Sequence, residues 1–395
     1  MSLLVGIIGK PNVGKSTFFS ALTENPVEIA DYPFTTIESN KGVTYIRAKC
    51  PETDIGKKCN PKLGKCVNGV RLVPVELIDV AGLVPGAHEG KGLGNKFLDD
   101  LRRADGFIQV VDSTGSMDHN GINVGRGKVD PLSDAEFVQN EIGLWLAGII
   151  SDGLIRNLRK LESEGGKLDA VIAEKVSGLG IDPKEVSAAV RNAGIPSNLK
   201  EWDDQVTLRL SKEIIRLSKP GIIVASKGDK IEQSEAVKLR ERGAIVVSGD
   251  YELVLRRASK AGLIDYFPGN NYFKIIDEGK LNIAQKEALK KVSDFLKANN
   301  GTQTQEAVEY LVYDVLKMIV VYPVEDENHW TDKNGNILPD AILMKQGSTA
   351  IDLAFKVHSD LGEKFIRAVN GRTKRVLGRD YQLQDGDVIK IVAAH

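Results

Sequence analysis

Residues 9–16 read Gly-Lys-Pro-Asn-Val-Gly-Lys-Ser and match the G-x-x-x-x-G-K-[S/T] pattern of a phosphate-binding loop. The apolar run at residues 3–8 is typical of a buried strand, and a helix is expected to follow from Ser16 to about Thr23. In such a strand–loop–helix unit, backbone N–H groups and the positive end of the helix dipole surround a phosphate. We therefore expect nucleotide contacts from Gly9, Asn12, Val13, Gly14, Lys15, Ser16 and Thr17.

Two side chains of this loop have expected chemical roles. The Lys15 ammonium would bridge the β- and γ-phosphates of a nucleoside triphosphate, and the Ser16 hydroxyl would ligate Mg²⁺. Kinases, ATPases and GTPases all use a loop of this type, so other segments must separate these classes.

A second phosphate-binding element is expected where the apolar run at residues 71–79 ends in Asp79, which is followed by Val-Ala-Gly. Asp79 is expected to hold Mg²⁺ through water, and the Gly82 N–H is expected to meet the γ-phosphate. The glycines between residues 82 and 94 favour a segment that becomes ordered when the γ-phosphate is bound, although an ordinary flexible loop has the same composition.

Residues 31–37 read Asp-Tyr-Pro-Phe-Thr-Thr-Ile and lie between these two elements. A threonine here would ligate Mg²⁺ with its hydroxyl and the γ-phosphate with its N–H. The residues themselves leave both Thr35 and Thr36 open.

A base-reading segment is expected at residues 226–229, Ser-Lys-Gly-Asp, which follow an apolar run. An ionised aspartate offers only acceptors, and guanine presents paired N–H donors that adenine lacks, so Asp229 is expected to select guanine. Lys227 would lie along the base, and Ser248 and Gly249 would support its edge. Taken alone, such a lysine–aspartate pair is also common in solvated turns.

Composition limits the class of protein. A chain of 395 residues predicts two or three domains at ~100–200 residues each. Lys plus Arg number 53 and Asp plus Glu number 54, so the formal charge of −1 excludes a protein that is basic throughout. No window approaches ~18 consecutive apolar residues, and no basic region precedes the first apolar run, so we expect neither a membrane span nor a signal peptide. Three cysteines exclude a disulfide framework, and we expect a cytoplasmic protein.

Apolar runs of strand length at residues 106–112, 221–225 and 244–247 alternate with helical stretches. This alternation predicts a parallel α/β sheet. We expect a nucleotide-binding domain of the P-loop class over residues 1–126 and 206–318.

A helical insertion is expected at residues 127–205. Ser133 and Glu136 form a capping-box pattern ahead of apolar residues at helical spacing, and residues 182–185, Asp-Pro-Lys-Glu, open a second helix that Gly194 closes. Beyond the insertion, residues from about 281 to 318 are again expected to be helical.

The C-terminal segment, residues 319–395, has short β-like runs around a helix beginning near Ala350, which suits a small β-grasp domain. Residues 361–379 carry one acidic residue, Glu363, against six basic ones: Lys364, Arg367, Arg372, Lys374, Arg375 and Arg379. Such a run is usually a solvated face, but on a small appended domain it would bind RNA phosphates. Few aromatic residues accompany it, so structured RNA is favoured over a single strand.

Cys50, Cys59 and Cys66 lie in one loop rich in Lys and Pro. Their spacing matches no two-residue zinc knuckle, and the sequence shows no evident fourth ligand. We expect free thiols, with a zinc site and a Cys59–Cys66 disulfide as the alternatives.

The chain resembles the Obg-related, YchF-like branch of translation-factor-class GTPases over essentially its whole length. The resemblance rests on the motifs at residues 9–16, 32–37, 79–87 and 92–97, and on a C-terminal segment that looks like a TGS domain. It implies an Mg²⁺-dependent GTPase, often associated with ribosomes, and aligns the family's magnesium threonine with Thr36.

Three positions modify what the resemblance implies. The GTPase pattern has Asn where this chain has Ser226, and the loss of an amide that braces the phosphate loop is expected to weaken guanine binding. ATP-preferring relatives carry Glu at the position of Asp229, so this chain's Asp favours GTP, with ATP as the alternative. Leu83 stands where many GTPases place the glutamine that orients the attacking water, so intrinsic hydrolysis is expected to be slow.

Two further residues are candidates near the phosphates. Relatives with an asparagine at the position of Asn12 use it to hold K⁺, and bracing of the loop is the alternative role. His88 would approach the nucleotide and join Lys15, Thr36 and Gly82 in catalysis, or else be an exposed loop histidine.

The first hypothesis is a monomeric regulatory GTPase that reports its nucleotide state to a ribosomal partner and is released by hydrolysis to GDP. The second is a nucleotide-gated RNA- or ribosome-binding module with incidental hydrolysis, which Leu83 favours. The third, a metabolic phosphotransferase, is disfavoured by Asp229 and by the glycine-rich segment after Asp79.

Overall fold

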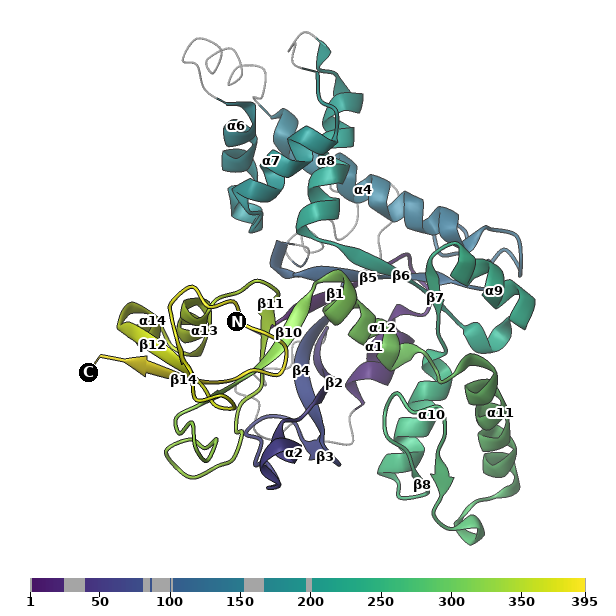
Figure 1. Cartoon of the computed structure of the whole chain (residues 1–395). Coiled ribbons are helices and arrows are strands. Elements are labelled where there is room, and N and C mark those ends of the chain that lie inside the picture. The colour runs from purple at the N-terminus through teal and green to yellow at the C-terminus, as the bar shows by residue number, and fades with distance from the viewer. Residues whose placement is uncertain are drawn as a thin grey trace. The chain divides into compact units, whose positions relative to one another are not determined.

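The computed structural model describes residues 2–24, 40–80, 86, 100, 102–152, 167–196 and 201–394 (Figure 1). The chain divides into two compact units. The larger unit comprises residues 4–24 and 77–307, and the smaller unit comprises residues 1–3, 25–76 and 308–395. The expected boundaries near residues 126, 205 and 318 stay a prediction.

A parallel sheet forms the centre of the larger unit, with its strands in the order β1 (Leu4–Ile8), β5 (Gly106–Asp112), β6 (Gly221–Ser226) and β7 (Ala244–Val246). Every residue of β1 and β5 is buried, because helices cover both faces of a parallel sheet. Parallel strands also end at the same edge, which brings the loops that follow them together. The predicted strands are confirmed.

Helices of the larger unit pack against the strands of the sheet and against one another. The helix after the phosphate loop, α1 (Lys15–Thr23), contacts α10 (Gly249–Lys260), and α9 (Gln233–Glu241) contacts β7. Helix α4 (Pro131–Ser151) contacts both β5 and α8 (Asp204–Ser218). The strand ends that carry the candidate site are thus anchored in a packed core.

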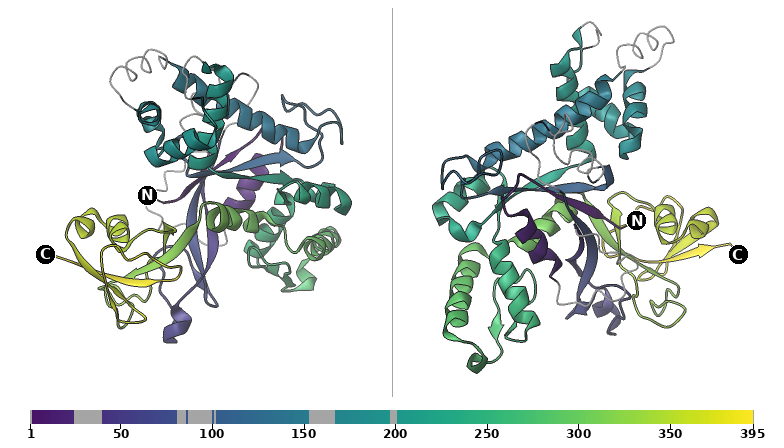
Figure 2. Two further views of the ribbon diagram at one scale, coloured as in Figure 1. Left: turned by 45° about the horizontal axis from the view of Figure 1, so that its top comes forward. Right: turned by 180° about the vertical axis from the view of Figure 1, so that it is seen from behind.

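Helix α4 takes part in three hydrophobic cores, and Leu132 and Ala135 at its start pack with buried residues of β5, β6, α9 and β7. Val138 and Ile142 pack with buried residues of β1 and β5, whereas Leu146 and Ile150 pack with α8 and two further helices. Those helices are α6 (Leu168–Val176) and α7 (Pro183–Asn192). In both views of Figure 2, the teal helices gather at one end of α4.

One predicted helix start is wrong and another is confirmed. Ser133 does not cap α4, since the helix begins at Pro131 and the Asp130 carboxylate accepts the Leu132 N–H at 3.1 Å. An N-cap aspartate followed by proline is the stronger start signal, and it lies ahead of the capping-box pattern. Helix α7 does begin with the capping box of Asp182.

The expected helical stretch at residues 281–318 is broken. Helix α11 (Ile283–Asn299) ends where Asn300 and Gly301 take left-handed φ values of 53° and 113°. A second helix, α12 (Thr304–Glu309), follows and continues into a π-helix, Tyr310–Val315. Two short strands, β8 (Ile264–Asp265) and β9 (Lys274–Ile275), pair between α10 and α11.

The C-terminal part of the smaller unit is the expected β-grasp domain. Its sheet has the strand order β11 (Ile342–Lys345), β10 (Met318–Val324), β14 (Val388–Ala393), β12 (Phe365–Asn370) and β13 (Val376–Leu377). Strands β10 and β14 are parallel, and the other neighbours are antiparallel. Helices α13 (Ala350–Val357) and α14 (Ser359–Glu363) follow β11, and Thr349 begins α13 with a capping box.

The smaller unit also contains strands that the sequence analysis did not predict. Strand β2 (Lys41–Lys49) neighbours β4 (Val70–Asp79), and a short β3 (Cys66–Val67) pairs with β4 on the other side. The one-turn helix α2 (Glu52–Ile55) lies between β2 and β3. None of the helices among the described residues has the length and apolar character needed to cross a membrane.

Candidate nucleotide-binding site

The phosphate loop lies between β1 and α1, and two of its positions require glycine. Gly9 has a φ of 148°, and a Cβ there would lie 2.4 Å from the Val110 carbonyl oxygen. Gly14 has a φ of 98°, and a Cβ there would lie 3.0 Å from the Ser226 hydroxyl. Any side chain would strain the backbone and collide with its neighbours, so these glycines let the loop sit against β5 and β6.

Ser226, at the end of β6, braces the phosphate loop with its hydroxyl. Its Oγ lies 2.5 Å from the Val13 carbonyl oxygen and 3.1 Å from that of Val111, and its single proton donates to the nearer Val13. The serine hydroxyl thus holds the loop in place of the amide of the GTPase pattern, and the expected weakening of guanine binding stays a prediction. The side chain is 4% exposed, so the bond is shielded from water.

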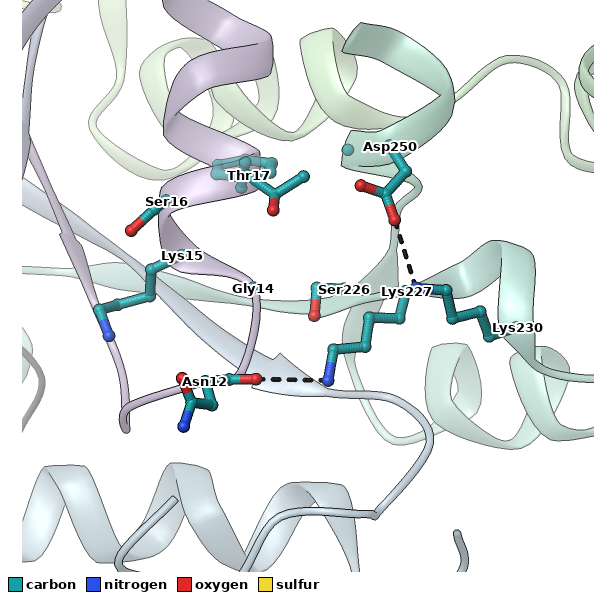
Figure 3. A pocket seen from close by; sticks show the side chains of 11 residues that line it. Asn12, Gly14, Lys15, Ser16, Thr17, Ser226, Lys227, Lys230 and Asp250 are labelled. Atoms are coloured by element: carbon teal, nitrogen blue, oxygen red, sulfur yellow. Dashed lines mark hydrogen bonds and ion pairs between the residues drawn. The ribbon is translucent and has the colours of Figure 1, made fainter. Parts of the chain in front are cut away.

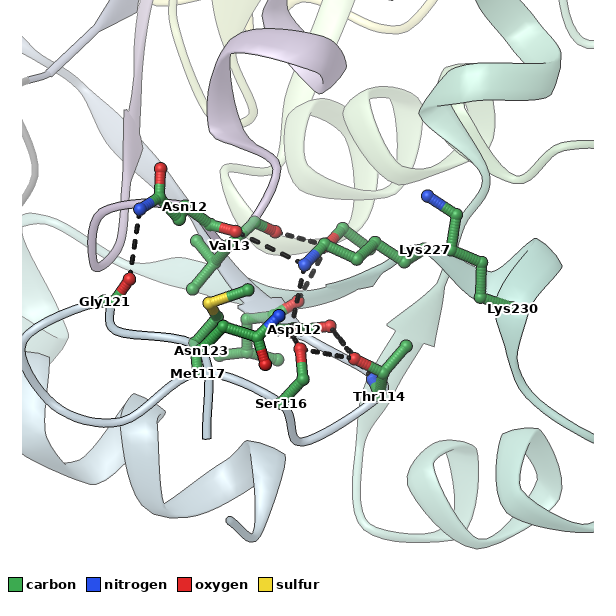
Figure 4. Close-up of polar contacts among 12 residues, drawn as sticks. Asn12, Val13, Asp112, Thr114, Ser116, Met117, Gly121, Asn123, Lys227 and Lys230 are labelled. Carbon is green, nitrogen blue, oxygen red and sulfur yellow. Dashed lines mark hydrogen bonds and ion pairs between the residues drawn. The ribbon is translucent and has the colours of Figure 1, made fainter. Parts of the chain in front are cut away.

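Lys227 holds the loop from the next position. Its Nζ donates to the Asn12 carbonyl oxygen at 3.3 Å and forms an ion pair with Asp112 Oδ2 at 3.0 Å (Figure 4). Asp112 also accepts hydrogen bonds from the hydroxyls of Thr114 and Ser116, each at 2.7 Å. Burial raises the pKa of Asp112, but these hydrogen bonds outweigh burial and bring it below its usual value.

These braces set the direction of the loop's backbone. The N–H of a planar trans peptide points opposite to its carbonyl. With the carbonyls of Asn12 and Val13 held by the side chains of Lys227 and Ser226, the N–H groups of Val13 and Gly14 point to the opposite side of the loop. Consecutive N–H groups directed to one side form an anion-binding concavity.

The loop is also held from the segment that follows β5. The Asn12 amide donates to the Gly121 carbonyl at 3.0 Å, which is the loop-bracing role. Lys10, at 1% exposure, forms a buried ion pair with Asp134 and donates to the Asp118 carbonyl at 2.8 Å. Sequence reasoning missed Lys10 and Asp134 because the loop pattern leaves residue 10 unspecified.

Lys15, Ser16 and Asp79 form the polar end of the site. Val80 N–H donates to the Ile7 carbonyl, which places Asp79 beside the end of β1, and Ser16 Oγ donates to Asp79 Oδ2 at 3.2 Å. Lys15 Nζ donates to the Lys10 carbonyl at 2.7 Å. Burial lowers the pKa of Lys15 and raises that of Asp79, and each charge opposes the shift of the other.

Asp79 has the property expected of a metal-facing carboxylate. Its Oδ1 is buried and has no hydrogen-bond partner among the described residues. A buried acceptor without a donor is costly unless a cation or an ordered water satisfies it. Together with the Ser16 hydroxyl, it fits the oxygen ligands that Mg²⁺ prefers.

The predicted base-reading residues come together at the other end. Asp229 lies in a 3₁₀ turn, Gly228–Lys230, and its Oδ1 accepts the Ser248 hydroxyl at 2.7 Å. The Gly228 N–H donates to the Val247 carbonyl at 2.9 Å, so this turn is tied to the chain that follows β7. Ser248 thereby orients the Asp229 carboxylate, a role that the sequence did not assign.

A pocket of about 320 Å³ extends from the phosphate loop to Gly249 and Asp250, and Asp229 is not among the residues that line it (Figure 3). Figure 3 shows Lys15 and Ser16 on one side and Lys230 and Asp250 on the other, where they form an ion pair of 3.3 Å. Lys230 was not predicted, whereas Asp250 lies in the segment beginning at Ser248 that was expected to support the base edge with backbone N–H groups. The pocket is lined by Asn12, Gly14, Lys15, Ser16, Thr17, Phe18, Ser226, Lys227, Lys230, Gly249 and Asp250.

Several predicted residues lie outside the described ranges. They are Thr35, Thr36, Gly82, Leu83 and His88. Their roles at the γ-phosphate, in Mg²⁺ binding and in catalysis stay predictions.

Three family models match the chain. One is described as "50S ribosome-binding GTPase" and matches residues 4–135. A second, "Obg-like GTPase YGR210-like, G4 motif-containing domain", matches residues 224–326. The third, "TGS domain", matches residues 334–393.

Individual proteins match over nearly the whole chain. "Uncharacterized GTP-binding protein MJ1332" of Methanocaldococcus jannaschii is 48% identical and covers 99% of each chain. "Ribosome-binding ATPase YchF" of Haemophilus influenzae is 28% identical and covers 98% of each. The crystal structure of a GTP-binding protein from Pyrococcus horikoshii OT3 is 38% identical, covers 100% of both chains and superposes with a TM-score of 0.76.

The brace from β6 yields a testable prediction. Changing Ser226→Ala removes the donor to Val13, and a lost hydrogen bond of this kind costs ~1 kcal/mol, so nucleotide affinity should fall about fivefold. The measurement is calorimetric titration with GDP and Mg²⁺. Ser218→Ala removes a comparable hydroxyl, bonded to the Ile214 carbonyl in α8, and should leave affinity unchanged. Equal affinities of the two variants would show that Ser226 does not brace the loop.

Proposed function

The chain belongs to the Obg-like family of GTP-binding proteins, and from that membership we propose that it binds Mg²⁺ and GTP and hydrolyses GTP to GDP and phosphate as a molecular switch. The observation that carries the proposal is the joining of a braced phosphate loop and the Asp229 carboxylate by one short segment, residues 226–229.

Mg²⁺ would be held by Ser16, by Asp79 and by the predicted Thr36. The unpartnered Asp79 Oδ1 supports this assignment. When bound, the ion neutralises charge that develops on the β- and γ-phosphates. Lys15 would leave the Lys10 carbonyl for the phosphates, because a charge-assisted bond to phosphate is stronger than a bond to a neutral carbonyl.

Guanine is the proposed base. The Asp229 carboxylate offers two acceptor oxygens, and Ser248 fixes its orientation. Adenine lacks the two N–H donors, so the hydrogen bonds from the base to this carboxylate would be lost when adenine enters. The ribosome-binding relative is named an ATPase, so ATP is the competing nucleotide to be measured.

Slow intrinsic hydrolysis is proposed because Leu83 replaces the usual water-orienting glutamine. A leucine side chain neither donates nor accepts a hydrogen bond, so another group or a partner must position water. Gly82, Thr36 and His88 remain the proposed participants, together with Lys15. K⁺ is proposed as an activator that the Asn12 side-chain oxygen would hold. The hydrogen bond from Asn12 to the Gly121 carbonyl uses the amide nitrogen.

The partner proposed for the switch is the ribosome, contacted through the C-terminal domain of a cytoplasmic monomer. The match to the 50S ribosome-binding GTPase model and the similarity to the ribosome-binding ATPase of Haemophilus influenzae support this proposal. Of the six basic residues in 361–379, Arg372 pairs with Asp54 and Lys374 donates to the Glu327 carbonyl. The remaining four, Lys364, Arg367, Arg375 and Arg379, are exposed and available to phosphates.

Multiple-turnover phosphate release tests the proposed activity. GTP and ATP are each supplied with Mg²⁺, with and without K⁺ and ribosomes. We expect slow phosphate release that is faster with GTP than with ATP. Lys15→Ala should abolish release, because it removes the positive charge that would contact the phosphates. Negligible release in every condition would contradict the switch, and transfer to a small-molecule acceptor would instead support a phosphotransferase.

The proposed base reader predicts a change in nucleotide preference. Asp229→Asn replaces one acceptor oxygen by a donor, and loss of hydrogen bonds to a charged group costs ~1.5–3 kcal/mol, or about 10–100-fold in GTP affinity. ATP affinity should change little. Asp294→Asn, an exposed carboxylate on α11 outside the pocket lining, is the control. Equal losses for GTP and ATP in Asp229→Asn would contradict guanine selection.

The exposed basic face predicts the salt dependence of ribosome binding. In the triple variant Arg367→Gln, Arg375→Gln, Arg379→Gln, co-sedimentation should weaken, and the log–log salt slope should fall by about 2–3, since each phosphate contact contributes ~0.7–0.9. The control removes three exposed charges from α11: Lys286→Gln, Lys290→Gln and Lys297→Gln. Identical behaviour of the two triple variants would exclude this face as the contact.

A further inference from the structure

The three cysteines of the chain converge in the smaller unit, where a carboxylate joins them. Cys50 follows β2, Glu52 opens α2, and Cys66 opens β3, while Cys59 lies in the intervening loop. One potential ligand atom from each of these four residues lies within 4.8 Å of the other three. We call these residues the Cys50 cluster. The sequence analysis saw no fourth ligand because Glu52 belongs to no cysteine spacing pattern.

The geometry of the Cys50 cluster suits a tetrahedral ion. Cys50 Sγ and Cys59 Sγ are 3.7 Å apart, and Cys66 Sγ is 3.2 Å from Glu52 Oε1. A tetrahedron with Zn–S bonds of ~2.3 Å has sulfur–sulfur edges of about 3.8 Å. All three thiols are free, and the Cys50–Cys59 separation far exceeds the ~2.05 Å of a disulfide bond. With every cysteine free, the structure contains no Cys59–Cys66 disulfide.

Hydrogen bonds position the potential ligands. Glu52 Oε2 accepts the Cys59 N–H at 2.8 Å, which leaves Oε1 on the side of Cys66. The Cys50 N–H donates to the Gly69 carbonyl at 2.8 Å. Hydrogen bonds of this kind hold the side chains that would bind a metal in the right orientation before the ion arrives.

Arg71 supplies a compensating charge. Its guanidinium is 1% exposed, and Nη1 lies 3.6 Å from Cys59 Sγ. Three thiolates and one carboxylate around a divalent cation leave a net charge of about −2, which a buried arginine offsets. A set of inert thiols needs no such cation beside it.

We propose that Cys50, Glu52, Cys59 and Cys66 bind one Zn²⁺ in a closed tetrahedral site. Thiolate ligands select Zn²⁺ over Mg²⁺ or Ca²⁺, and four protein ligands leave no open position, so the site is structural. An iron–sulfur cluster usually takes four cysteines, and this chain has three.

The loop that carries the Cys50 cluster contacts the beginning of the C-terminal domain within the same unit. The Asn60 N–H donates to the Ile337 carbonyl at 2.8 Å, and the Lys62 N–H donates to the Pro339 carbonyl at 2.9 Å. Arg71 donates to the carbonyls of Leu338 and Pro339 at 3.0 and 2.9 Å. Zn²⁺ would therefore fix the segment of residues 50–71, which is hydrogen-bonded to residues 337–339.

Metal analysis of the full-length wild-type chain is the first test. The chain is purified under reducing conditions from zinc-supplemented cells, and we expect about one Zn²⁺ per chain. Replacing Zn²⁺ by Co²⁺ should produce thiolate-to-cobalt charge-transfer bands and the intense d–d bands of a tetrahedral ion. The chain has no other cysteine, so these bands report this cluster alone. Absence of Zn²⁺ and of the cobalt bands in the reduced chain overturns the proposal, as does a Cys50–Cys59 disulfide in its mass spectrum.

Variants test the ligand set. Cys66→Ser and Glu52→Gln should each weaken Zn²⁺ binding, measured by chelator competition. The loss should be at least ~10–100-fold, which is typical of losing a residue that only orients a metal ligand. Asp54→Asn, on the same helix and outside the cluster, should keep wild-type affinity. Wild-type affinity in Glu52→Gln would remove the fourth ligand and overturn the site as proposed.

A readout on the wild-type chain tests the structural role without any substitution. Lys57 and Lys58 are exposed in the loop, so trypsin can report how firmly the loop is held. Chelator treatment should accelerate cleavage there about tenfold or more relative to cleavage in α11. Equal acceleration at both places, or none, would contradict a zinc-held loop.

Discussion

The hydrogen bonds from Ser226 and Lys227 to the carbonyls of the phosphate loop are the interactions on which the rest of the site depends. They turn the loop's N–H groups to one side, and they explain why Gly14 must lack a side chain where the Ser226 hydroxyl approaches. The same tetrapeptide carries Asp229. Only two residues, Lys227 and Gly228, therefore separate Ser226 at the phosphate end of the site from Asp229 at the base end.

Much of this architecture could be predicted from the sequence. The buried strands of a parallel sheet are continuous apolar runs, and the phosphate loop has a specific pattern, so β1, β4, β5, β6 and β7 were found with bounds close to those observed. The β-grasp domain was likewise recognisable from its caps and short strands. Strand β2 was missed because the three fully buried residues at its centre, 44–46, include a threonine and a tyrosine, so no continuous apolar run marks the strand.

Side-chain partners were harder to predict, because they join residues more than one hundred positions apart. The Lys10–Asp134 pair and the Lys227–Asp112 pair have no local signature. The contact made by Ser226 was not predicted for a related reason: the family pattern compares residue names, whereas the structure shows that this hydroxyl reaches the Val13 carbonyl. The Cys50 cluster shows the same limit, since its carboxylate is identified by proximity and not by spacing.

The central claim is that the braced loop and Asp229 together form a guanine nucleotide site. The most direct measurement is calorimetric titration of the unmodified chain with GDP and with ADP, each with Mg²⁺, under identical conditions. We expect GDP to bind at least ~100-fold more tightly, because adenine lacks the paired N–H donors that the Asp229 carboxylate would accept. Equal affinities, or tighter binding of ADP, would contradict it.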